Sequence, residues 1–156
     1  MGQVTILSQL QKRLLDLVVA EPTLVRDYYW TGGTVLSEFY LQHRDSEDID
    51  LFTENAEVKI DSITVFINQA AKKLGASEIK YTQFLGLHTF IFEFSDYPSL
   101  KIDFNYYPFT PFEAGGKYKL LKYDSVLDIA VNKIQTIATK PRSRDFIDLY
   151  MIHRKY

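Results

Sequence analysis

The spacing of apolar residues alternates between helical and strand-like along this chain, and this pattern restricts the fold more than any other feature. Residues 5–20 carry apolar side chains at helical spacing, at Leu7, Leu10, Leu14 and Val18. Strand-like runs follow at 28–31, 49–51, 78–84, 87–94 and 100–105, with a helix expected at 60–74. Helical spacing returns at 124–138 and in a last helix that begins at Pro141 or Ser143. Strands gathered between helices predict an α+β fold with a small mixed β-sheet flanked by helices.

Length and composition restrict the class of protein. A chain of 156 residues is long enough to bury its own core, and we predict a single domain over residues 1–156. The absence of cysteine excludes disulfides and thiolate metal sites. The apolar run at 14–20 is interrupted by Asp16 and is far shorter than the ~20 residues of a membrane span. We recognise no signal peptide, so we expect a cytoplasmic protein with no membrane partner.

The charge is unevenly distributed within a net value of −2. Acidic residues predominate up to residue 116, and basic residues predominate after it. A basic C-terminal quarter could attract a polyanion, but a solvated helical surface would have the same composition. The charge pattern alone does not distinguish the two.

Two glycines stand where the strand at 28–31 passes into a helix expected at 34–41. Glycine lets a backbone approach a ligand closely, and a helix N-terminus offers free N–H groups and the positive end of its dipole to a phosphate. Gly32-Gly33-Thr34 is therefore a candidate phosphate loop. A plain tight turn would use the same residues.

Two aspartates alternate with apolar residues in Asp48-Ile49-Asp50-Leu51. Side chains two apart on a strand point to the same face, so Asp48 and Asp50 project together while Ile49 and Leu51 face the core. Adjacent carboxylates repel each other unless a cation lies between them. The pair predicts a site for Mg²⁺ (or Mn²⁺), which prefers oxygen ligands. A solvated pair on an edge strand is the alternative.

Asp103 lies on the opposite face of its strand from Ile102 and Phe104. On a strand beside Asp48 and Asp50, it would complete the metal site and could take a proton from an attacking hydroxyl. On its own, this pattern is also common on protein surfaces.

The stretch from Trp30 to Phe52 resembles the signature of the nucleotidyltransferase superfamily, and specifically the AbiEii/AbiGii toxin family of abortive-infection toxin–antitoxin systems. That family joins a glycine-containing phosphate loop to Asp-x-Asp through an Arg-x-Ser segment, which is Arg44-Asp45-Ser46 here. A lysine on a helix (Lys133) and an Arg-Asp-x-x-Asp motif at 144–148 follow in the family's order. The resemblance covers residues 30–150.

The resemblance implies transfer of a nucleoside monophosphate from a nucleoside triphosphate to an acceptor hydroxyl. The acceptor could be RNA (a tRNA 3′ end included), a protein or a small molecule, and the implied partner is a cognate antitoxin. The implied catalytic residues are Asp48, Asp50, Asp103, Lys133 and Asp145, with Asp145 positioning Lys133 or Arg144. The implied metal ligands are Asp48, Asp50 and Asp103, and the implied nucleotide-binding residues are Gly32, Gly33, Thr34, Arg44, Ser46 and Lys133.

Simpler explanations exist for several of these residues. Arg44 could form a surface salt bridge, Lys133 could be a solvated side chain, and Asp145 with Asp148 could be acids favoured by a helix dipole. The aromatic residues between 104 and 112 could stack on a base, although we favour packing, and the three histidines receive no role. The alternative function is a non-catalytic nucleotide-binding or regulatory protein that retains the fold.

Overall fold

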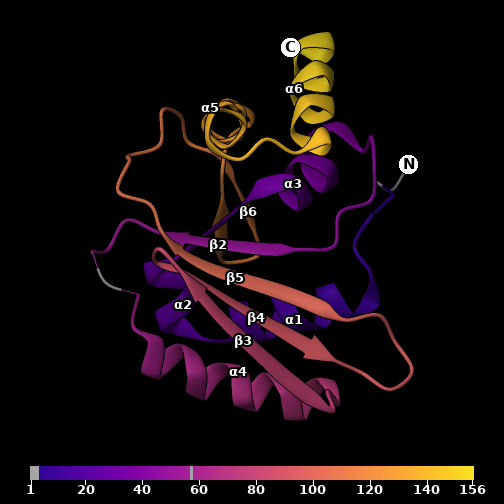
Figure 1. Cartoon of the computed structure of the whole chain (residues 1–156), viewed down its shortest axis with the longest axis vertical. Helices are drawn as coiled ribbons and strands as arrows, with labels where there is room; N and C mark the ends of the chain where they lie inside the picture. The colour runs from indigo at the N-terminus through magenta and orange to yellow at the C-terminus, as the bar shows by residue number, and fades with distance from the viewer. Residues whose placement is uncertain (1–3, 57) are drawn as a thin grey trace.

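The computed structural model describes residues 4–56 and 58–156, which form a seven-stranded mixed β-sheet with helices on both faces (Figure 1). The strands are β1 (Tyr29–Thr31), β2 (Ile49–Thr53), β3 (Glu78–Phe84), β4 (Leu87–Glu93), β5 (Leu100–Tyr106), β6 (Gly116–Tyr118) and β7 (Leu121–Tyr123). Their order is β3-β4-β5-β2-β1-β7-β6. The β2–β5 and β1–β7 pairs are parallel, and the other neighbours are antiparallel.

Helices lie on both faces of the sheet. They are α1 (Gln9–Val19), α2 (Pro22–Asp27), α3 (Gly32–Val35), the π-helical turn η1 (Leu36–Leu41), α4 (Ile60–Leu74), α5 (Val126–Thr139) and α6 (Ser143–Lys155). Figure 1 shows α1, α2 and α4 on one face, and α3, α5 and α6 on the other. The predicted α+β class with a mixed sheet is confirmed. The sheet is larger than the small one we predicted, because β6 and β7 extend it.

The core lies between β2, β5 and the helices α1 and α4. Ile49, Leu51, Ile102 and Phe104 on the strands are fully buried, as are Leu14, Leu15 and Val18 of α1. Side chains alternate along a strand, so burying these apolar residues on one face directs Asp50 to the other, toward α5 and α6. Packing of the core therefore decides which face carries the acids.

Three elements differ from the predictions. The first helix begins at Gln9 rather than at residue 5, because Ser8 and Gln11 form a reciprocal capping box. The helix expected at 34–41 is one turn of α-helix from Gly32 followed by the wider η1, which ends at Gln42 in a left-handed conformation. The hairpin of β6 and β7 was not predicted, because each strand has only three residues and its turn has Lys119, not glycine, at positive φ.

None of the helices in the described part of the chain is both long and apolar enough to cross a membrane.

Candidate active site

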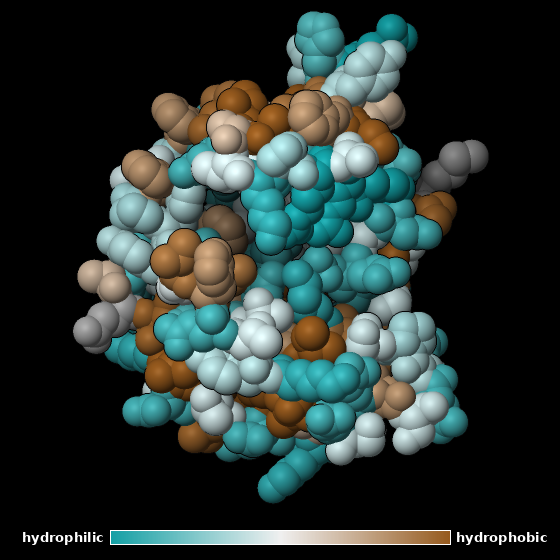
Figure 2. Space-filling view, in the orientation of Figure 1, coloured by the Kyte–Doolittle hydropathy of each residue, from teal (hydrophilic) through white to brown (hydrophobic). Residues whose placement is uncertain are grey.

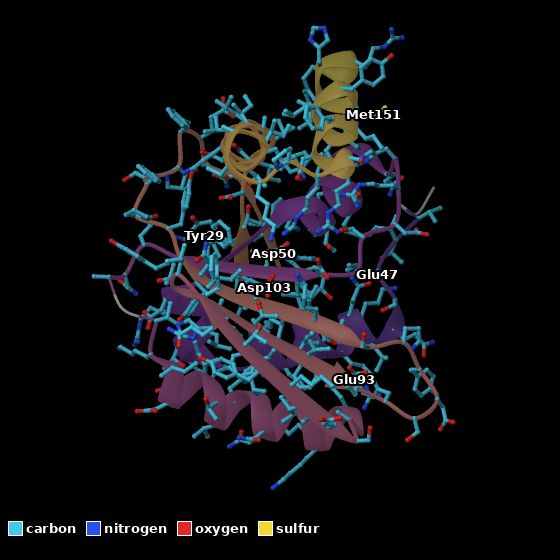
Figure 3. The ribbon with its side chains drawn as sticks, viewed as in Figure 1. Tyr29, Glu47, Asp50, Glu93, Asp103 and Met151 are labelled. Atoms are coloured by element: carbon cyan, nitrogen blue, oxygen red, sulfur yellow. The ribbon has the colours of Figure 1, made fainter. Side chains whose placement is uncertain are left out.

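A cleft of about 390 Å³ opens over the face of β2 and β5 that carries the acids, and α5 and α6 form its other wall. Figure 3 shows Asp50 and Asp103 side by side on β2 and β5 below these helices. Figure 2 shows hydrophilic surface at the centre of the same view, with hydrophobic surface over α5 above it and more hydrophobic surface to its left. The cleft brings together all but one of the predicted site residues: Gly32, Gly33, Arg44, Ser46, Asp48, Asp50, Asp103, Lys133 and Asp145. The exception is Thr34.

The register of two parallel strands places two carboxylates next to each other. Asp50 on β2 is directly opposite Asp103 on β5, and Asp48 lies just before β2 on the same face. The carboxylate of Asp50 makes no hydrogen bond or ion pair with any described residue. Burial, reinforced by the charges of Asp103 and Asp48, raises the pKa of Asp50 to about 7. Asp50 is the acid of this group that most lacks a compensating cation.

Lys101, to which the sequence analysis gave no role, lies between two of the acids. Its Nζ is 3.0 Å from Asp48 Oδ2 and 2.9 Å from Asp103 Oδ2. Burial lowers the pKa of Lys101, but the carboxylates of Asp103 and Asp48 outweigh burial and hold it above its usual value. The second oxygen of Asp103 accepts a hydrogen bond from Thr89 Oγ1 at 2.6 Å. Lys101 therefore partly neutralises the acids and leaves Asp50 uncompensated.

The donors present fit a metal that is shared with a ligand. Among the described residues, no three acidic or histidine side chains are grouped so that they could hold an ion by themselves. Mg²⁺ does not need such a group, because it is usually held by one or two carboxylates together with waters and substrate phosphates. Asp48 and Asp50 supply two carboxylates on one face, with space above them in the cleft. Their chemistry suits Mg²⁺ bound together with a phosphate.

The two glycines leave space for charged side chains of this same site. Gly32 has a φ of +85°, and a Cβ there would lie 2.2 Å from Asp50 Oδ2. A Cβ at Gly33 would lie 2.6 Å from Arg44 Nη2. Any larger residue would displace the Asp50 carboxylate or the Arg44 guanidinium from its position at the cleft.

Thr34 lies behind the cleft and not in its lining. Its side chain is fully buried, and Thr34 Oγ1 donates to the carbonyl oxygen of Asp48 at 2.5 Å and lies 2.9 Å from Ser46 Oγ. This hydroxyl holds the segment that carries Ser46 and Asp48, and the nucleotide-binding role of Thr34 stays a prediction. Gly33 and Ser46 line the cleft beside it.

A completely buried carboxylate, Asp148 of α6, gathers three basic side chains. Arg44 donates to it through Nε (2.8 Å) and Nη2 (2.7 Å), Lys133 Nζ is 2.6 Å away, and His43 Nε2 is 2.6 Å away. Burial opposes ionisation of Asp148, but the hydrogen bonds from Arg44, Lys133 and His43 lower its pKa to about 2. His43 was given no role from the sequence, and no spacing rule links it to a residue 105 positions later.

Lys133 and Asp145 form the pair that the family motif implied. Lys133 Nζ donates to Asp145 Oδ1 at 3.0 Å, and both side chains are buried. The other oxygen, Asp145 Oδ2, is buried and has no hydrogen-bond partner among the described residues. Lys133 is therefore held by Asp145 and Asp148 at the wall of the cleft, and it is not a solvated surface lysine.

Three of the donors of Arg44 are bonded within the protein, so it offers a phosphate fewer hydrogen bonds than a free guanidinium would. Two of its nitrogens are bonded to Asp148, and Nη1 donates to the carbonyl of Asp45 at 2.9 Å. Arg142 and Arg144, at the start of α6, also line the cleft, and the side chain of Arg144 is 46% exposed. Its Nη2 lies 3.7 Å from Asp48 Oδ2. Arg144 is therefore the more available cation for a bound anion.

A second, larger hollow of about 750 Å³ lies between α2, the start of β1 and the segment 111–117. None of the predicted site residues lines it. We place the candidate active site in the smaller cleft, because the repelling carboxylates and the surrounding cations meet there.

Comparison with known proteins identifies the family. The model of the nucleotidyl transferase AbiEii toxin family (type IV toxin–antitoxin systems) matches residues 17–156. The chain belongs to this family. No curated protein matches the chain significantly.

Solved structures with low sequence identity share the fold. One is the crystal structure of JHP933 from Helicobacter pylori, with a TM-score of 0.65 and 16% identity over 93% of this chain and 65% of that one. Another is the Megavirus polyadenylate synthase, with a TM-score of 0.60 and 13% identity over 94% of this chain and 31% of that one. The chain thus spans about two thirds of the first of these proteins and about a third of the second.

Replacing Asp50 by Asn should stabilise the metal-free protein more at pH 8 than at pH 5. With its raised pKa, folded Asp50 holds a proton more tightly than the unfolded chain does. Its contribution to the unfolding free energy therefore falls as the pH rises from ~4 to about 7. The gain in the free energy of unfolding from Asp50→Asn should be roughly 1–3 kcal/mol larger at pH 8 than at pH 5. Urea denaturation in EDTA measures it. Asp61→Asn, a change at an exposed residue of α4, is the control. An equal gain in the free energy of unfolding of Asp50→Asn at both pH values would contradict the repulsion between Asp50 and the neighbouring carboxylates.

Replacing Lys133 by Ala should lower the unfolding free energy by about 3–5 kcal/mol, because Asp145 and Asp148 lose the cation that they share. Lys140→Ala, exposed at the end of the same helix, should change it by less than ~0.5 kcal/mol. Denaturation curves at pH 7 measure both variants. Similar curves for the two would mean that Lys133 is dispensable for the packing of α6 on α5.

Proposed function

We propose that this chain is a Mg²⁺-dependent nucleotidyltransferase that moves a nucleoside monophosphate from a nucleoside triphosphate to an acceptor hydroxyl. The observation that carries the proposal is the meeting of Asp48, Asp50 and Asp103 in one cleft, with basic side chains around them. Membership of a nucleotidyl transferase family supports it independently. A non-catalytic binding protein would gain nothing from an uncompensated carboxylate such as Asp50.

Asp48 and Asp50 are the residues that would hold the metal, with phosphate oxygens and waters as its remaining ligands. When bound, Mg²⁺ supplies positive charge that stabilises the phosphoryl oxygens as the reaction proceeds. The raised pKa of Asp50 is consistent with a group that is compensated only when a cation is present.

The cations of the cleft would bind the phosphates. Lys133 is fixed by two carboxylates and can act as a positioned point charge, while Arg144, which is half-exposed beside Asp48, can offer two parallel hydrogen bonds. Both would neutralise the pyrophosphate that leaves when its bond to the α-phosphorus breaks. Gly32 and Gly33, whose missing Cβ atoms leave space for Asp50 and Arg44, line the cleft where the phosphates would lie.

Asp103 would take the proton of the acceptor hydroxyl as that oxygen forms its bond to the α-phosphorus. Its Oδ2 accepts from Lys101, and movement of Lys101 away from it would free that lone pair for the proton. A phosphate beside Lys101 would favour that movement, because it offers the ammonium group another anion. Binding of the triphosphate would thereby prepare the base.

The acceptor and the partner follow from the family. We propose RNA, a tRNA 3′ end included, as the first acceptor class to test, followed by proteins and small molecules. As the toxin of a toxin–antitoxin pair, the chain would arrest growth and would be counteracted by a cognate antitoxin.

Mg²⁺ and a nucleoside triphosphate together should raise the melting temperature more than the sum of their separate effects, because each completes the binding site of the other. At ligand concentrations ~100-fold above the Kd, the stabilisation should reach roughly 2.7 kcal/mol. Thermal melts with Mg²⁺, Mn²⁺, each triphosphate and every pair measure it. Additive shifts would count against a shared site.

Asp50→Asn should reduce nucleotidyl transfer by roughly 10²–10⁴-fold, because loss of a metal ligand removes several kcal/mol of stabilisation. The assay incubates protein, Mg²⁺ and each labelled triphosphate with total RNA or cell lysate and identifies what becomes labelled. Asp61→Asn should match the wild type. Equal labelling by Asp50→Asn would sink the catalytic assignment, and no labelling by any variant would favour the non-catalytic alternative.

A further inference from the structure

The candidate active site has a charged end and a neutral end. Around Asp48 the lining is basic, with Arg44, Lys101, Lys133, Arg142 and Arg144. Beyond Asp50 and Asp103 it is uncharged, with Phe52, Leu87 and Asn105 on the strands and Asn132 of α5, which also borders the hollow beside Tyr29 and Tyr107. Asp48 and Phe52 are four residues apart on an extended segment, which separates the two ends by about 13 Å. The acids lie between them.

The neutral end has an aromatic wall. Phe52 follows Asp50 by two residues on the same face of β2, about 7 Å further along the strand. Its ring centroid lies 6.2 Å from that of Tyr29 and 5.5 Å from that of Tyr107. Figure 3 shows Tyr29 on the side of Asp50 away from Glu47. We expected the aromatic run to pack in the core, and Phe104 is fully buried there, but Tyr107 packs on Phe52, which lines the cleft.

Two amides at this end have unused hydrogen-bonding groups. Asn105 is directly opposite Phe52 on β5, and Asn132 projects from α5 across the cleft. Both side chains are half-buried, and neither amide makes a hydrogen bond to any other described residue. An amide carries donors and an acceptor together, so this pair can match the edge of a planar heterocycle that also carries both.

We propose that the neutral end binds the nucleobase of the triphosphate, with Phe52 against the face of the base and Asn105 and Asn132 on its edge. This inference rests on the proposed function. A nucleotide has a polyanionic tail and an uncharged base, and only the basic end can accept the tail. The α-phosphate is then beside Asp50, and the nucleoside extends toward Phe52. Aromatic stacking accepts any base, so the amides would set the preference among bases.

The test compares nucleotides with a ligand that lacks the base. Calorimetry in Mg²⁺ measures binding of inorganic tripolyphosphate and of ATP, GTP, CTP and UTP to the wild type and to Phe52→Leu. Leucine keeps an apolar contact with Tyr29 and Tyr107 but removes the ring. The wild type should bind at least one nucleotide roughly 10-fold to 100-fold more tightly than tripolyphosphate. Phe52→Leu should lose most of this difference and bind tripolyphosphate as the wild type does.

Asn105→Ala and Asn132→Ala test the contacts with the edge of the base. Both residues are half-buried, so these two variants should fold and can test the inference even if Phe52→Leu does not fold. Each should change the order of affinity among the four nucleotides without changing tripolyphosphate binding, and Asn68→Ala on α4 should change neither. Tripolyphosphate binding with no tighter binding of any nucleotide, or an unchanged order in both Asn variants, would overturn this inference alone. Failure of the wild type to bind tripolyphosphate or any nucleotide would overturn the proposed function as well.

Discussion

The parallel pairing of β2 with β5 is the constraint on which the rest of the site depends. It places Asp50 opposite Asp103 and, on the other face, it buries Ile49 and Leu51 beside Ile102 and Phe104. A shift of one residue in β2 would turn Asp50 into the core and Leu51 into the cleft. The hydrophobic effect that stabilises this core therefore also holds two like charges next to each other, a position that they would not adopt by themselves.

Charge compensation explains how α5 and α6 close the cleft. Asp148 is fully buried, and only its contacts with Arg44, Lys133 and His43 make its ionised form acceptable there. A buried ion pair adds little stability compared with apolar packing, but removing one partner is costly, so such a network favours one arrangement of helices over others. The network thereby fixes Lys133 at the wall of the cleft and α6, with Arg144, at its rim.

Much of this arrangement follows from local pattern. The alternation of polar and apolar residues in 48–51 and 100–104 predicts which aspartates face away from the core. Through the family resemblance, a lysine on a helix followed by Arg-Asp-x-x-Asp indicates that these residues share one site. The same period indicates that Lys101 shares a face with Asp103, so its position could have been predicted. The Ser8-x-x-Gln11 capping box was also present as a signal for the first helix start. The site roles themselves remain predictions.

Contacts between distant segments could not be predicted. Arg44 was expected to bind phosphate, but two of its nitrogens are bonded to Asp148, 104 residues later, and no local pattern records that pairing. Thr34 was expected in the phosphate loop, but its hydroxyl is bonded to Asp48 and Ser46. Both results depend on how η1 and the following loop return to the sheet, and that path includes a π-helical turn that apolar spacing does not distinguish from an α-helix.

The glycine pair connects these observations. A tight turn and a phosphate loop were alternatives in the sequence; in the structure Gly32 and Gly33 form the turn, and the phosphate loop stays a prediction. Gly32 turns the chain with a positive φ, and the missing Cβ leaves space for the Asp50 carboxylate. The missing Cβ of Gly33 leaves space for the Arg44 guanidinium. The glycines are thus required by the protein's own charged side chains before any ligand is considered. This gives a physical reason why a Gly-Gly turn and an Asp-x-Asp strand occur together: the turn makes room for the second aspartate, and that aspartate then faces the cleft.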